Sequence, residues 1–141
     1  MTVPKRTWLD FRVRYAETDQ MGVVYHANYF VWCEIARTEL IRRRGASYAD
    51  LEKQGVLLAV ADVSMRYRSP ARYDEMIRAE TWIEEVRSRT VTFGYEILRL
   101  DESGSTPPQR LATASTRLIA LDADSRPRKL PPDLMQALAN D

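Results

Sequence analysis

One short segment holds most of the residues that could carry out chemistry. It reads YAETDQMGVVYHANYF and runs from Tyr15 to Phe30. It contains Asp19, among turn-forming residues, and His26, the only histidine of the chain. A carboxylate can activate water or attack a carbonyl carbon directly. Asp19 and His26 are therefore the first candidates for catalytic residues.

A helix is expected to begin beside them, near Asn28, because asparagine is a favoured N-cap and apolar residues then recur at helical spacing. The first turn of a helix carries unpaired N–H groups and a partial positive charge, which suit an oxyanion. A carbonyl group between these N–H groups and Asp19 would be polarised on one side and would face a carboxylate on the other. The spacing allows such an acyl-transfer site, and it equally allows a turn aspartate beside a packed histidine.

The composition limits the partners and the compartment. Among 141 residues, 21 basic and 20 acidic side chains leave a net charge of +1, which does not favour nucleic-acid or membrane-surface binding. The longest apolar run, Val56 to Ala61, is far too short to cross a bilayer. The single cysteine, Cys33, has apolar neighbours, so we expect it to be buried, in a cytoplasmic protein without disulfides. One histidine and one cysteine do not suggest a metal site.

The remaining chain predicts an antiparallel sheet packed on this helix. A long apolar helix followed by mostly hairpin-linked strands is an α+β arrangement, with the helix on one face of the sheet. Gly94, inside an alternating strand, predicts a bulge or a close backbone approach. We expect one domain over residues 1–141, with its core at about 8–121. Strands are expected over residues 8–15, 56–67, 76–86, 90–100 and 110–121, and short helices over 47–54 and 131–139.

The segment RVRYAETDQMGVVYHANYFVWCEIAR, Arg12 to Arg37, resembles the signature of the hotdog-fold acyl-CoA thioesterases. It is similar to the branch that contains 4-hydroxybenzoyl-CoA thioesterase and the Tol-Pal-associated acyl-CoA thioesterases. The similarity continues through RYRSPARYDE and IEEVRSRTVTFGYEI. It implies a hotdog fold, in which about five antiparallel strands wrap a long central helix. It also implies an acyl-CoA thioesterase that needs no cofactor beyond the coenzyme A of its substrate.

The resemblance assigns roles by position. Asp19 matches the catalytic aspartate, acting as base or nucleophile. His26 matches the position whose backbone N–H polarises the thioester carbonyl, and its imidazole is a second candidate group. Gly22 matches the motif glycine, which lets the loop approach the helix closely. The expected supporting residues of the active site are Tyr15, Gly22, Tyr25, Ala27 and Asn28.

Substrate-binding residues are implied further along the chain. Arg87, Arg89 and Thr90 match positions that contact the nucleotide and pantetheine parts of coenzyme A, and arginine suits phosphate. Leu58 and Ala59 match the region that lines the acyl pocket. Alternatively, the two arginines are solvated residues at the end of a hairpin, and Leu58 and Ala59 are ordinary core residues.

The acyl group is expected to be aliphatic. The 4-hydroxybenzoyl branch has a tyrosine–proline pair where this chain has His26 and Ala27. This departure argues against a hydroxybenzoyl substrate and favours a short or medium acyl-CoA.

The resemblance also implies a homodimer or homotetramer, because a hotdog subunit exposes a sheet edge that can pair with a second copy. Two other functions stay open at this point. One is a hotdog hydratase or dehydratase acting on acyl-CoA or acyl-carrier protein, which turnover of crotonyl-CoA would identify. The other is a non-catalytic acyl-CoA-binding module, which would bind without turnover.

Overall fold

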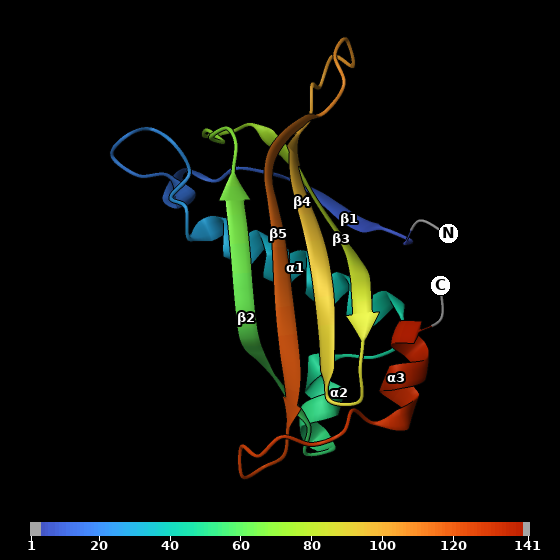
Figure 1. Ribbon diagram of the computed structural model, residues 1–141. Coiled ribbons are helices and arrows are strands. Elements are labelled where there is room, and N and C mark those ends of the chain that lie inside the picture. The colour runs from blue at the N-terminus through green and yellow to red at the C-terminus, as the bar shows by residue number, and fades with distance from the viewer. Residues whose placement is uncertain (1–3, 140–141) are drawn as a thin grey trace.

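Figure 1 shows the computed structural model, which describes residues 4–139. A five-stranded antiparallel sheet, in the order β1-β3-β4-β5-β2, lies against one long helix, α1. This is the α+β arrangement predicted from the sequence. In chain order the elements are β1 (Thr7–Arg12), a 3-10 turn (Tyr15–Glu17), α1 (Asn28–Arg43), α2 (Tyr48–Lys53), β2 (Leu57–Tyr67), β3 (Met76–Val86), β4 (Thr90–Arg99), β5 (Gln109–Leu121) and α3 (Pro132–Ala139).

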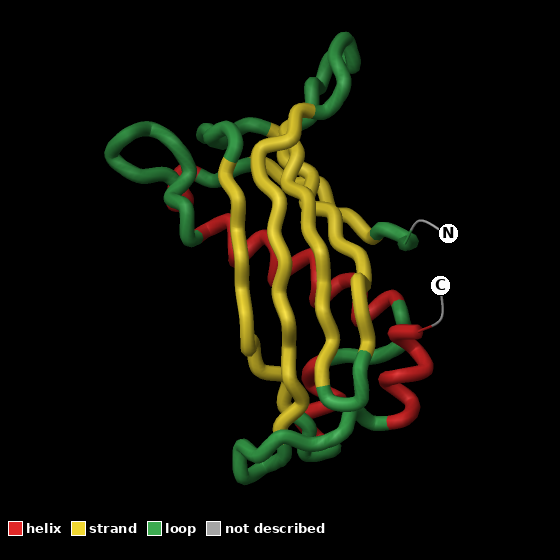
Figure 2. The backbone as a smooth tube through the Cα atoms, viewed as in Figure 1, coloured by secondary structure: helices red, strands yellow, loops and turns green. Residues whose placement is uncertain are grey.

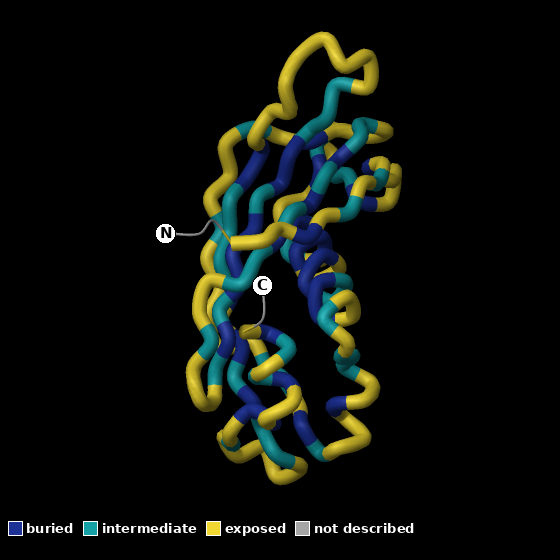
Figure 3. Tube along the Cα trace, turned by 90° about the vertical axis from the view of Figure 1, so that its right-hand side faces the viewer, coloured by how far each residue is buried: buried dark blue, intermediate teal, exposed yellow. Residues whose placement is uncertain are grey.

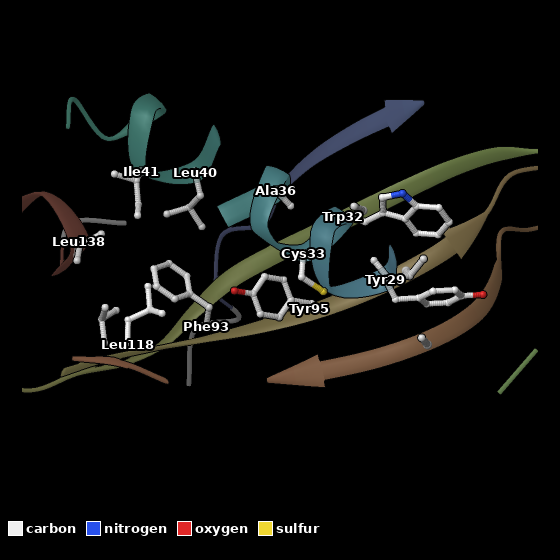
Figure 4. Close-up of a cluster of buried hydrophobic side chains, with 14 of the residues drawn as sticks. Tyr29, Trp32, Cys33, Ala36, Leu40, Ile41, Phe93, Tyr95, Leu118 and Leu138 are labelled. Carbon is white, nitrogen blue, oxygen red and sulfur yellow. The ribbon is translucent and has the colours of Figure 1, made fainter. Parts of the chain in front are cut away.

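The core lies between α1 and the inner face of the sheet, as the backbone traced in Figure 2 and the profile view in Figure 3 show. Side chains of a strand alternate between its two faces. The alternation predicted for β4 is confirmed, because its four inward-facing residues are all buried. Figure 4 shows side chains of α1 meeting those of the sheet, with Cys33 beside Tyr95. The buried residues of β4 on this face are Val91, Phe93, Tyr95 and Ile97.

The start of α1 differs from the prediction. Its N-cap is Ala27, without a side-chain capping bond, and Asn28 is the first helical residue. Residues 25–27 already form a turn, in which the Asn28 N–H donates to the Tyr25 carbonyl at 2.9 Å. The Asn28 side chain is thereby released for a tertiary contact, and its Nδ2 donates to the Glu17 carbonyl at 2.8 Å.

The other helix signals are confirmed. Gly45 follows the C-cap of α1 with a φ of 91°, a conformation that favours glycine. Ser47 caps α2 by accepting a hydrogen bond from the Asp50 N–H at 3.2 Å, and Gly55 ends that segment with a φ of 77°. β1 ends at Arg12, earlier than expected, because the 3-10 turn begins shortly after it.

Gly94 is required for space rather than for a bulge. It pairs regularly with Trp82 and Ser115, so the alternative of a bulge at this residue is wrong. A Cβ atom at Gly94 would lie 2.5 Å from the Trp82 ring and 2.5 Å from the Glu84 carboxylate. The close approach is therefore made by side chains on the outer face of the sheet, not by backbone.

A buried cation joins α1 to the sheet. The Arg37 guanidinium, on α1, donates to the hydroxyls of Tyr48 at 2.9 Å and Tyr95 at 3.1 Å. Burial raises the pKa of Tyr95 to about 12, although the Arg37 charge opposes the shift. Its hydroxyl therefore stays protonated at neutral pH, and it lies 2.6 Å from the Thr116 hydroxyl. These bonds hold α1, α2 and two strands in one arrangement.

Cys33 confirms the expectation of a buried cysteine on α1. Burial raises the pKa of its thiol to about 12, against a smaller opposing effect of the Arg37 charge. It is a packed thiol at neutral pH, not a nucleophile. Across residues 4–139, neither α1 nor any other helix has the length and apolar character to cross a bilayer.

Candidate active site

The Asp19 loop, residues 18–24, folds back on itself at the N-terminal end of α1, on the upper left of Figure 1. Thr18 and Val24 form an isolated antiparallel bridge that closes the loop. Within it, the Asp19 N–H donates to the Val23 carbonyl at 2.9 Å, and the Gly22 N–H donates to the Asp19 carbonyl at 3.0 Å. Gly22 has a φ of 79°, so the turn requires the conformational freedom of glycine.

The Asp19 carboxylate is half-buried and only partly engaged. Its Oδ1 accepts a hydrogen bond from the Met21 N–H at 2.9 Å, as in a common aspartate turn. Its Oδ2 accepts none from any residue between 4 and 139. Asp19 thus has a turn role through one oxygen and leaves the other oxygen available for chemistry.

The approach to α1 offers free backbone donors. The N–H groups of His26 and Ala27 donate to no acceptor in the described part of the chain. The next N–H groups are used locally, since Asn28 donates to Tyr25 and Tyr29 donates to the His26 carbonyl at 3.3 Å. The helix dipole adds partial positive charge at this end. One of the two free groups, the His26 N–H, is the group that the family resemblance assigns to the thioester carbonyl, and the Ala27 N–H lies beside it.

A cavity of about 230 Å³ adjoins the start of α1. Aromatic rings form much of its wall, with Tyr67 edge-on to His26 at 6.3 Å and to Tyr29 at 5.1 Å between ring centroids. Such an apolar wall suits an apolar group of a ligand. The lining residues are Val24, His26, Tyr29, Tyr67, Arg68, Ser69 and Pro70.

Tyr67 is a site residue that the sequence did not reveal. Its hydroxyl donates to the His26 backbone carbonyl at 2.8 Å, which ties the end of β2 to the start of α1. The only local signal is a tyrosine at the end of a strand, before a turn. The partner lies 41 residues away, so only the tertiary fold identifies the contact.

Glu17 is the second residue missed. It is 5% exposed. Its Oε1 accepts from the Arg14 N–H at 2.8 Å, and its Oε2 accepts from the Trp32 indole Nε1–H at 2.7 Å. Burial alone would raise the pKa of the Glu17 carboxyl, but these hydrogen bonds and the Arg14 charge outweigh it and lower that pKa below its ordinary value.

The two predicted tyrosines differ in their placement. The Tyr25 ring lies 4.5 Å from the His26 ring, between centroids, and therefore borders the site. Tyr15 is 77% exposed, and its ring contact is with Tyr73 at 5.5 Å. Tyr15 thus lies on the surface rather than against the cavity at the helix start.

The residues predicted to bind coenzyme A meet around a second cavity, of about 380 Å³, at the β3–β4 hairpin. This cavity is polar and mostly basic. Arg87 forms an ion pair with Glu85 at 2.6 Å, whereas the Arg89 guanidinium has no acidic partner among residues 4–139. The lining residues are Glu85, Arg87, Ser88, Arg89, Thr90, Thr92 and Arg117.

This hairpin cavity lies far from the Asp19 loop. Thr90, Ile119 and Ala59 are neighbours across β4, β5 and β2, at the opposite end of the sheet from Tyr67. From Ala59 to Tyr67 the strand extends about 25 Å, at roughly 3.3 Å per residue. A single chain therefore does not bring the predicted acyl-pocket residues, Leu58 and Ala59, or the hairpin arginines together with Asp19.

Comparison with known proteins identifies the family. Residues 21–105 match the family described as the thioesterase superfamily. The chain belongs to this superfamily. The predicted hotdog fold and the predicted class, an enzyme that hydrolyses thioesters, are thereby confirmed. The match includes His26 and begins after Asp19, whose role stays a prediction.

Individual thioesterase relatives agree over most of the chain. It is 50% identical over 88 residues to YneP of Bacillus subtilis. The matched region covers 62% of this chain and 64% of YneP. It is 32% identical over 125 residues to the acyl-CoA thioester hydrolase YbgC of Escherichia coli, covering 88% and 89%. The solved DHNA-CoA thioesterase of Staphylococcus aureus superposes with a TM-score of 0.85 at 38% identity, covering 94% of this chain and 87% of that one.

Replacing Tyr67 with Phe tests the contact to the helix start. The change removes one hydrogen bond to the His26 carbonyl, and we expect thioester hydrolysis to fall about two- to tenfold, in line with roughly 0.5–1.5 kcal/mol for such a bond. The measurement is kcat/KM for thioester hydrolysis, at a temperature well below the Tm of each variant. Tyr73→Phe is the matched control, since the Tyr73 hydroxyl has no hydrogen-bond partner within residues 4–139. Equal rates for both variants would contradict the assignment.

The lowered pKa of Glu17 predicts a pH dependence of stability. A carboxyl whose pKa is lower in the folded than in the unfolded chain stabilises the fold above the ordinary glutamate pKa of about 4.3. This stabilisation is lost as the pH falls through the lower, folded pKa. Denaturant unfolding of the wild type and of Glu17→Gln should therefore differ most at neutral pH and converge as the pH falls from about 5 to 3. A constant difference across this range would refute the prediction.

Proposed function

We propose that this thioesterase hydrolyses short or medium acyl-CoA thioesters, with Asp19 as general base or nucleophile. The observation that carries the proposal is the pairing of a partly free carboxylate with two free N–H groups at the start of α1. The relatives named as acyl-CoA thioester hydrolases support the substrate class. The apolar wall beside His26 supports an apolar acyl group.

In the proposed reaction the thioester carbonyl oxygen accepts hydrogen bonds from the N–H groups of His26 and Ala27. These donors stabilise the negative charge that develops on this oxygen. As a base, Asp19 takes a proton from water while the water oxygen bonds to the carbonyl carbon. The carbon–sulfur bond then breaks, and the coenzyme A thiolate leaves and is protonated.

The nucleophilic alternative uses the same geometry. Here Asp19 Oδ2 attacks the carbonyl carbon, the thiolate leaves, and water hydrolyses the resulting mixed anhydride. Both routes require an ionised carboxylate at position 19. The His26 imidazole borders the same cavity and is a further candidate for contact with the thioester.

The site is proposed to be completed by a second copy of the chain, as a homodimer at least. β2 is an edge strand of eleven residues, and Val60 and Val63 on it are 52% and 51% exposed. Val63 pairs with the buried Thr116, so it points to the helix side of the sheet but lies beyond the cover of α1. An isologous antiparallel pairing about the middle of β2 would cover these side chains.

Such a pairing would also bring together the predicted site residues that lie at opposite ends of a single sheet. Pairing about the middle of β2 places the beginning of one copy of the strand opposite the end of the other. Leu58 and Ala59 of one copy would then lie near Tyr67 of the second, and the basic hairpin cavity would approach the other copy's Asp19 loop. Coenzyme A phosphates at Arg87 and Arg89 fit this arrangement, because guanidinium groups bind phosphate well.

Asp19→Asn tests the reaction. It keeps the side-chain shape and removes the charge, so we expect kcat for release of coenzyme A thiol to fall about 100- to 10,000-fold. A series of acyl-CoA chain lengths, followed by thiol release, would define the preferred acyl group. The matched control is Asp10→Asn, because Asp10 pairs with Arg78 at 2.8 Å on the outer face of the sheet. Wild-type turnover by Asp19→Asn would exclude both catalytic roles.

Val63→Asp tests the proposed dimer. A carboxylate at this position would be buried in the paired interface without a counter-charge, so we expect smaller particles by light scattering and a parallel loss of hydrolysis. Ser64→Asp is the control, since Ser64 is the next residue on the same strand and points to the opposite face. A wild-type chain that stays monomeric at every concentration would contradict the proposal.

A further inference from the structure

Glu17 is a buried carboxylate that lies next to the reacting groups without joining them. It precedes Asp19 by two residues, at the end of the 3-10 turn, and it does not line the cavity beside His26. A buried carboxylate is costly unless its oxygens are hydrogen-bonded. Both of its oxygens are hydrogen-bonded, and their donors come from two separate parts of the chain.

The contacts of Glu17 close the Asp19 loop and tie its beginning to α1. Its backbone carbonyl accepts from the Tyr25 N–H at 2.9 Å and from Asn28 Nδ2 at 2.8 Å, just before and at the start of the helix. Its carboxylate accepts from the Trp32 indole at 2.7 Å, in the second turn of the helix. The residue just before the Asp19 loop is therefore bonded to the residue just after the loop and to the first two turns of α1.

Trp32 is a firm anchor for this attachment. Its side chain is 1% exposed. It stacks on Tyr29 at 4.9 Å and meets Phe11 edge-on at 5.3 Å, between ring centroids. Its indole N–H therefore has a fixed position relative to the free N–H groups at the helix start, and so does the carboxylate that accepts from it.

A carboxylate suits this place better than an amide. The Arg14 N–H and the Trp32 indole N–H reach different oxygens of Glu17. A glutamine has one acceptor oxygen and one NH₂ group, so one of the two donors would face another donor. The fold thus requires two acceptors from one side chain at this position.

We propose that Glu17 is a positioning residue for thioester hydrolysis: by binding the Trp32 indole, it holds the Asp19 carboxylate in place at the N-terminus of α1. The inference rests on the proposed role of Asp19. Catalysis depends steeply on such placement, because a displacement of about 1 Å can cost on the order of 100-fold in rate. Glu17 itself makes no contact with the reacting atoms.

The test is a double-mutant cycle of Glu17→Gln and Trp32→Phe, with kcat and KM measured well below the Tm of each variant. Trp32→Phe keeps an aromatic ring in the core and removes the donor, together with part of the buried ring volume. We expect each single change to lower kcat about 5- to 100-fold with KM changed less than about threefold, since the loss falls on placement and not on binding. The double variant should be no slower than the slower single variant, because both changes break the same contact.

A spectroscopic readout accompanies the kinetics. The indole N–H resonance of Trp32, assigned by its absence in Trp32→Phe, should move with pH as Glu17 titrates in the wild type and should not move in Glu17→Gln. The matched control is Glu80→Gln, because Glu80 pairs with Arg6 at 2.8 Å on the outer face of the sheet. It should keep the wild-type kcat and the wild-type titration of the resonance.

The outcomes distinguish the positioning role of Glu17 from the proposed thioesterase function. A wild-type kcat in folded Glu17→Gln, or independent, multiplying losses in the double variant, overturns the positioning role. If Glu17→Gln does not fold, Trp32→Phe alone tests the positioning role. An unchanged kcat in Trp32→Phe also overturns that role. A wild-type protein that hydrolyses no acyl-CoA refutes the proposed function instead, and the inference about catalysis falls with it.

Discussion

The packing of α1 against the inner face of the sheet is the constraint on which the rest of the structure depends. A helix of sixteen residues has to bury one side, and the inner face of the sheet supplies a large apolar surface for it. This packing leaves the helix N-terminus at one end of the sheet, where its free N–H groups meet the Asp19 loop. The geometry of the candidate site is therefore a consequence of the core, because the same Trp32 that fills the core also binds Glu17 at the beginning of the loop.

Much of this could be predicted from local sequence. Gly45, Ser47 and Gly55 mark helix ends because their conformations and capping bonds are local. The alternation in β4 identified its buried face, since side-chain direction follows residue order alone. The prediction that Asn28 caps α1 was wrong because the Asn28 side chain donates to the Glu17 carbonyl. This tertiary contact outweighs the local preference for an N-cap.

The parts that could not be predicted depend on sheet order. Nothing in the sequence of β2 indicates that it forms the edge next to β5, or that Tyr67 reaches His26. Likewise, nothing in the sequence separates the hairpin arginines from the Asp19 loop, yet the strand order puts them at opposite ends of the sheet. Nothing in the sequence singles out Glu17, because its burial and its bond to Trp32 arise only in the folded chain.

The position of β2 in the sheet has a consequence for folding. Within the described chain its only strand partner is β5, the last strand to be synthesised, although β2 itself precedes β3 and β4. Pairing so distant in sequence is slow, and chains emerge from the ribosome N-terminus first. During synthesis, β2 therefore has no strand partner on either edge until β5 has been made. Until β5 has formed, this strand has unpaired edges and is therefore a site at which nascent chains could aggregate.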